Sequence, residues 1–149
     1  MKVLEKADKI TEAVKKVFEM TAFIEFEDSF IPDTDSYRNL PGIIVYVNYE
    51  LQDKKGSVYL FWSQTLADEA AASYLGDEES SSENIVDALL ELSNMVAGNI
   101  LNVLIEKDEV YELEIPKILV KDSDHELQHP QYKIFFTEFD EKWIVVEIC

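Results

Sequence analysis

The sequence contains few of the residues that mark several common classes of protein. One cysteine is present among the 149 residues, Cys149, so no disulfide can form within the chain, which fits a reducing compartment. The four glycines are well separated, which excludes a glycine-rich phosphate-binding loop. No low-complexity segment or long linker divides the sequence. We therefore expect one domain over residues 1–149.

Positive charge is also scarce. The chain has 13 lysine and arginine residues against 31 aspartate and glutamate residues, a formal net charge of −18 at pH 7. A chain this acidic repels nucleic acid backbones and anionic membranes, so we expect neither as a partner. Basic surfaces and cations are the partners that this charge favours. An equally simple interpretation is that the charge only keeps the protein soluble.

Long apolar runs are absent as well. The N-terminal residues lack the apolar run of a signal peptide, and no stretch reaches the length needed to cross a bilayer. The longest candidate stretch contains Glu91 and Asn94. Because hydrophobic residues still make up 47% of the chain, a packed core is expected. These features predict a soluble protein of the cytoplasm.

Hydrophobic periodicity predicts an α+β protein. The predicted helices span 8–20, 64–75 and 83–106, the second capped by Ser63 and Gly76 and the third by Ser80. The predicted strands span 21–26, 43–49, 57–62, 110–115, 132–136 and 143–148, with a hairpin turn at 53–56. This order can be divided into two similar halves, each a helix followed by three strands, with the second helix between them.

The third predicted helix carries the main functional signal. On a helical wheel of about 100° per residue, one side is apolar and forms a core face. The apolar side consists of Ile85, Leu89, Leu92, Val96, Ile100 and Val103. The opposite side carries a polar strip of Asp87, Glu91, Asn94 and Gly98, flanked by Leu90 and Leu101 on one edge and by Met95 on the other.

This strip has two interpretations. Acidic residues on a solvated helix face are ordinary. However, no lysine or arginine follows Asp87 or Glu91 at the spacing that would pair them. Gly98 costs about 1 kcal/mol relative to alanine inside a helix, which is tolerated where a partner backbone approaches. Leucines beside a polar strip are typical of a docking surface. We therefore interpret Asp87, Leu90, Met95, Gly98 and Leu101 as partner-binding residues.

The same residues match a family pattern. The stretch DALLELSNMVAGNIL, with Asp87-x3-Glu91-x2-Asn94, resembles the phosphatase helix of the CheX, CheC and FliY proteins. Pro116 stands where the motif of that family continues to a proline. The segment GSVYLFWSQTLADEAA resembles the passage from strand to helix that precedes the motif in CheX proteins. The resemblance extends over nearly the whole chain and implies an antiparallel-type sheet packed with long helices.

The resemblance also implies an activity. The chain would be a protein phosphatase that hydrolyses the phosphoaspartate of a CheY-like response regulator in chemotaxis. The regulator supplies a Mg²⁺ ion and a lysine, so no metal or other cofactor needs to bind this chain. As catalytic residues, Asn94 would orient the attacking water, as a glutamine does in small GTPases, and Glu91 would pair with the regulator's lysine.

Two further expectations follow from the same family. In CheC proteins the motif occurs twice, but here the first helix offers Asp8, Glu12 and then Lys15 in place of the asparagine, so only one active helix is expected. CheX-like proteins form dimers through their sheets. Because the run 143–146 is apolar enough to need cover on both faces, we expect a homodimer.

Other readings of the sequence stay open or weak. His125 and His129 have metal-ligand spacing only in a helix, and Pro130 favours a surface loop instead. The chain could bind a receiver domain without hydrolysing its phosphoaspartate, or act as an adaptor like the flagellar switch proteins of related fold. The charge alone would also suit a mimic of nucleic acid.

Overall fold

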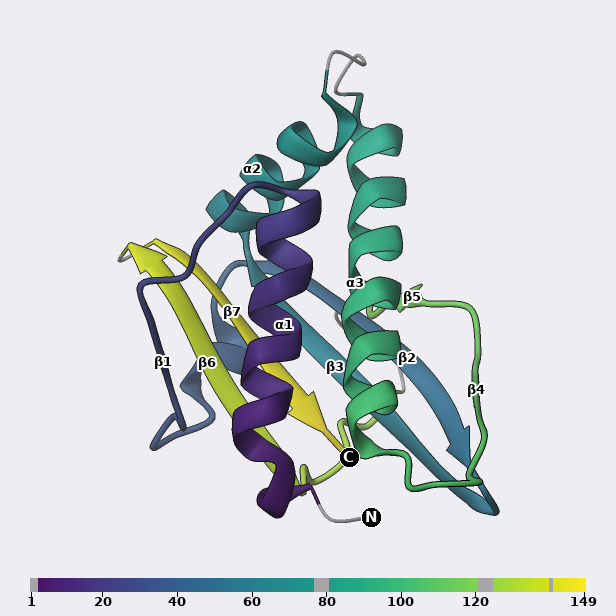
Figure 1. Cartoon of the computed structure of the whole chain (residues 1–149). Coiled ribbons are helices and arrows are strands. Elements are labelled where there is room, and N and C mark those ends of the chain that lie inside the picture. The colour runs from purple at the N-terminus through teal and green to yellow at the C-terminus, as the bar shows by residue number, and fades with distance from the viewer. Residues whose placement is uncertain (1–2, 77–80, 121–124, 140) are drawn as a thin grey trace.

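A layer of helices lies on one face of a single sheet (Figure 1). The computed structural model describes residues 3–76, 81–120, 125–139 and 141–149. The helices are η1 (Leu4–Lys6), α1 (Ala7–Thr21), η2 (Ser36–Asn39), α2 (Gln64–Leu75) and α3 (Ser82–Leu104), η denoting a 3₁₀ helix. The strands are β1 (Asp28–Phe30), β2 (Gly42–Leu51), β3 (Lys54–Ser63), β4 (Tyr111–Leu113), β5 (Lys117–Ile118), β6 (Tyr132–Phe139) and β7 (Lys142–Ile148).

The sheet is antiparallel throughout and confirms the predicted α+β class. Its seven strands run in the order β1-β6-β7-β3-β2-β4, and β5 also pairs with β2. Strands β6 and β7 lie between β1 and β3, so both halves of the chain contribute to one sheet. Strands β3 and β7 lie in the middle and are buried on both faces, which explains their nearly continuous apolar sequences.

The main core lies between the sheet and helices α1, α2 and α3. Alternate residues of the strands point toward the helices because successive side chains of a strand face opposite sides. Val45, Val47 and Leu60 are among the fully buried members. This core fixes α3 against the sheet, with α1 and α2 as its helical neighbours. None of the helices within the described ranges is long and apolar enough to span a membrane.

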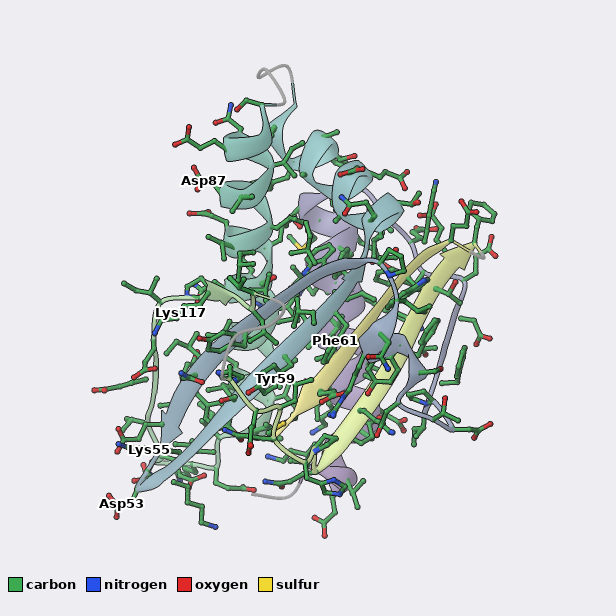
Figure 2. All side chains as sticks on the ribbon, turned by 180° about the vertical axis from the view of Figure 1, so that it is seen from behind. Asp53, Lys55, Tyr59, Phe61, Asp87 and Lys117 are labelled. Atoms are coloured by element: carbon green, nitrogen blue, oxygen red, sulfur yellow. The ribbon has the colours of Figure 1, made fainter. Side chains whose placement is uncertain are left out.

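A second, smaller core covers the opposite face of the sheet. Its buried members are Tyr37, Tyr59, Phe61, Trp143, Val145 and Cys149. Figure 2, which views the molecule from behind, shows Tyr59 and Phe61 on this face. The chain itself therefore covers the apolar run 143–146, so this run no longer supports the expected dimer. The homodimer itself stays a prediction.

A buried ion pair fastens η2 to this second face. Glu147 is fully buried, and Arg38 donates from Nη2 to its Oε1 over 2.7 Å and from Nε to its Oε2 over 3.0 Å. The Tyr37 hydroxyl also donates to Oε2 of Glu147. Burial and this bond raise the pKa of Tyr37 well above its ordinary value. The bidentate contact with Arg38 compensates for the cost of burying the Glu147 carboxylate.

The predicted strand 21–26 was wrong. The alternation there is real, because Ile24 and Phe26 are buried, but it reflects insertion into the main core and not pairing within a sheet. Phe23, which precedes Ile24, has a φ of 57° in the left-handed region and is 80% exposed. Strand pairing begins only at β1.

The predicted hairpin turn at 53–56 was displaced by two residues. Leu51 pairs with Lys54, so Gln52 and Asp53 form the turn, and Gln52 has a φ of 56°. Gly56 lies inside β3 opposite Tyr49. A side chain at Gly56 would collide with the Tyr49 ring, whose hydroxyl donates to the Cys149 carbonyl over 2.8 Å. This glycine makes room for a ring and does not form a turn.

Candidate functional site

Helix α3 begins at a serine cap. The Ser81 hydroxyl accepts a hydrogen bond from the Asn84 N–H over 3.2 Å, which satisfies one of the free donors of the first turn. The predicted cap, Ser80, lies outside the described residues. The predicted start at residue 83 and the end at residue 106 each differ from the observed bounds by one or two residues.

The inner side of α3 is buried in the main core. Its buried residues are Ala88, Leu89, Leu92, Ser93, Val96, Ala97, Ile100, Leu101 and Leu104. Ser93 is the polar exception, and its hydroxyl accepts a hydrogen bond from the Trp62 indole over 3.1 Å. The bond ties the middle of α3 to β3, so the outward residues of the same turn have a fixed orientation.

The predicted polar strip does lie on the outward side of α3. Asp87 and Glu91 are exposed, and Asn94 and Gly98 are half-buried. Figure 2 shows Asp87 on the outer side of the helix, directed away from the sheet. Residues at i, i+4 and i+7 of a helix share one face, so Asp87, Glu91 and Asn94 are brought together as the spacing predicts.

Glu91 has a partner that the sequence did not reveal. The hydroxyl of Tyr74, near the end of α2, donates to Oε2 of Glu91 over 2.9 Å. This bond is the first cause, and burial the second, of a pKa of Tyr74 above its ordinary value. The two residues are 17 positions apart and belong to different helices. No spacing rule for a single helix could have connected them.

Asn94 and Asp87 have no such contacts with the described residues. Within residues 3–76, 81–120, 125–139 and 141–149, neither side chain has a hydrogen bond or an ion pair. The half-buried amide of Asn94 therefore presents an unused donor and an unused acceptor beside the Glu91 carboxylate. A carbonyl in that position can accept a hydrogen bond from a water molecule and orient it.

Gly98 lies under the edge of β4. A Cβ added at Gly98 would meet Leu113 Cδ1 at 3.6 Å, which is ordinary contact. The Tyr111 hydroxyl donates to Asn102 Oδ1 over 2.7 Å and lies 3.4 Å from the Gly98 carbonyl oxygen. An alanine would therefore fit within this chain, and packing inside the molecule gives no reason for the glycine.

One predicted docking residue was misplaced. Leu101 is 0% exposed and belongs to the main core, so it cannot lie on an exposed rim. The wheel gives angles around α3 but cannot show that β4 returns over its C-terminal half, where Tyr111 and Leu113 reach Gly98. Leu90 and Met95 are half-buried and pack partly against the same core, which leaves only part of each side chain exposed.

Within the part of the chain that the structure describes, the other sequence candidates do not form a site. Asp8 and Glu12 are exposed and Lys15 is half-buried on α1, without the amide that α3 provides. His125 lies in an irregular segment with its Nε2 2.8 Å from the Tyr59 hydroxyl, so the predicted loop is confirmed. Among the residues that the structure describes, no group of histidine, cysteine or carboxylate side chains could hold a metal ion. Asp122 and Asp124 lie outside them.

Comparison with known protein families shows which family the chain belongs to. The model of the family described as chemotaxis phosphatase CheX matches residues 45–140, which is more than half of the sequence and includes all of α3. The chain belongs to the CheX family. A search of curated proteins finds no match. The predicted resemblance is therefore confirmed at the level of the family.

Solved structures show that this CheX-family chain has the fold of its relatives. The CheX of the CheX–CheY–BeF₃–Mg²⁺ complex from Borrelia burgdorferi superposes with a TM-score of 0.73 at 18% identity, covering 96% of each chain. CheX from Desulfovibrio desulfuricans superposes with a TM-score of 0.72 at 21% identity, covering 97% of this chain and 98% of that chain. A CheC-like protein from Shewanella oneidensis superposes with a TM-score of 0.70 at 24% identity, covering 100% of this chain and 99% of that chain.

Proposed function

We propose that this chain is a phosphatase that hydrolyses the phosphoaspartate of a CheY-like response regulator. The observation that carries the proposal is the outward face of α3. There Glu91 lies together with the amide of Asn94, which has no bonding partner among the described residues. That face lies within the part of the chain that matches the chemotaxis phosphatase family. The B. burgdorferi relative has been solved in a complex with CheY, BeF₃ and Mg²⁺, which supports a CheY-like partner.

The proposed mechanism assigns different tasks to the two side chains. An amide cannot act as a general base at neutral pH, so Asn94 orients the attacking water through its carbonyl, in line with the phosphorus. Glu91 pairs with a lysine of the receiver and fixes the docking position. The Mg²⁺ ion belongs to the receiver. Phosphoryl transfer depends mainly on positioning and electrostatic stabilisation, which suits a protein that contributes two groups and no metal.

Two finer statements belong to the same proposal. We propose that this chain acts in the cytoplasm, together with its regulator. We also propose a homodimer, on the family resemblance alone. Asp87, the exposed part of Leu90 and of Met95, and Gly98 complete the surface on which the receiver docks.

The test is the decay of phosphorylated receivers. A panel of CheY-type receivers is phosphorylated with acetyl phosphate, and the loss of phosphoryl group is followed with and without this protein. We expect at least one receiver to lose its phosphoryl group faster when the protein is present. Binding without faster decay would make the chain a receiver-binding module, and no effect on any receiver would refute the proposed function.

A further inference from the structure

Tyr74 is the one described residue that bonds to the carboxylate of Glu91. Its hydroxyl donates to Oε2 over 2.9 Å. The other oxygen, Oε1, has no bonding partner among the described residues. One oxygen of the carboxylate is thus held by α2, while the second is available to a group that arrives from outside.

The position of Tyr74 is fixed by its own helix. Helix α2 is capped at the start by the Ser63 hydroxyl, which accepts from the Leu66 N–H over 3.3 Å. It ends at Gly76, which has a φ of 65°. The Tyr74 ring is half-buried and packs against the main core. An anchored ring carries a hydroxyl with little freedom, so the bond restrains an otherwise mobile glutamate side chain.

We infer that Tyr74 is a positioning residue, which holds Glu91 in the orientation that receives the lysine of a phosphorylated receiver. This inference rests on the proposed function and adds a residue to it. A glutamate that is free to rotate loses conformational entropy when it pairs with a partner, and that loss weakens binding. Tyr74 removes part of this loss before the receiver arrives. Its role acts through Glu91, so it needs no contact with the reacting phosphoryl group.

The inference predicts a specific pattern in a double-mutant cycle. The probe is the receiver that the unmodified protein dephosphorylates fastest, used phosphorylated for kinetics and loaded with beryllofluoride and Mg²⁺ for binding. Tyr74→Phe should raise KM and Kd about three- to tenfold, which corresponds to the net contribution of a typical hydrogen bond, with kcat little changed. In a Glu91→Gln background, Tyr74→Phe should have almost no further effect.

A matched control separates positioning from packing. Tyr59→Phe also removes one tyrosine hydroxyl, which lies 2.8 Å from His125 Nε2 on the face of the sheet opposite to α3. It should leave KM and Kd unchanged. A second readout needs no receiver: the NMR titration midpoint of the Tyr74 ring should lie above the ordinary value for tyrosine and should fall in Glu91→Gln.

The outcomes that overturn the inference differ from those that overturn the function. If Tyr74→Phe weakens binding as much in Glu91→Gln as in the unmodified chain, or if Tyr59→Phe weakens it equally, Tyr74 does not act through Glu91. An unchanged Tyr74 midpoint in Glu91→Gln would mean that the bond does not form in solution. In these cases the phosphatase proposal stands. If the unmodified protein acts on no receiver and binds none, the function and the inference fail together.

Discussion

At the scale of single residues, the side chains on the outward face of α3 differ in whether they have a hydrogen-bond partner. Asn94 has no bonding partner among the described residues, whereas Glu91 has Tyr74. Sequence spacing predicted correctly that the two share a helix face. It could not predict Tyr74, because that contact depends on how α2 and α3 pack and not on a pattern within either helix.

Gly98 allows stability and docking to be separated. Gly98→Ala should stabilise the fold by about 0.5–1 kcal/mol, because alanine is the better helix former and its Cβ fits 3.6 Å from Leu113. A thermal melt should show a rise in Tm of about 2–4 °C per kcal/mol. The same methyl group should weaken docking and raise KM for the phosphorylated receiver. If both stability and KM are unchanged, the glycine has no docking role.

At the scale of elements, one leucine on α3 is in the core and another lies partly at the surface. Leu101→Ser should destabilise the protein by about 3 kcal/mol or more, because it leaves a cavity and buries a hydroxyl. Leu90→Ser is the matched variant and should cost less stability while raising KM for the receiver. Urea denaturation and kinetics on both variants check this. A Leu101→Ser variant of normal stability would contradict its burial.

The second face of the sheet depends on η2. Arg38→Ala should destabilise the protein by about 3–5 kcal/mol, because it leaves the buried carboxylate of Glu147 without its cationic partner. Lys133→Ala is the control. Its 2.6 Å pair with Asp35 lies at the same loop but near the surface, and its loss should cost less than about 1 kcal/mol. If urea denaturation shows the same loss of unfolding free energy in both variants, the buried Arg38 pair stabilises the fold no more than the surface pair does.

The sequence predicted the elements better than their connections. The three long helices and the strands of the sheet centre were found because their apolar periodicity records burial. The same signal misassigned 21–26, where Ile24 and Phe26 are buried without pairing in the sheet. Gly56 suggested a turn, but its small size serves the Tyr49 ring. Leu101 was misplaced because a helical wheel does not show which neighbouring elements pack against α3, and Leu101 is fully buried in the main core.

At the scale of the whole molecule, the predicted homodimer can be checked directly. Light scattering at micromolar concentration should give about twice the chain mass of 17.2 kDa. The apolar strand β7 no longer argues for a dimer, because the chain itself covers both of its faces. A mass equal to that of one chain at this concentration would contradict the prediction and leave the monomer as the docking unit.

The central claim is that Asn94 orients the water that attacks the phosphoaspartate. The most direct measurement compares the decay of a phosphorylated CheY-type receiver with the unmodified protein and with Asn94→Ala, alongside the Kd for the beryllofluoride-loaded receiver. We predict that Asn94→Ala loses about a hundredfold of the acceleration, as expected when a reacting group is no longer positioned, while the Kd changes by no more than about threefold. Full acceleration by Asn94→Ala would contradict the account.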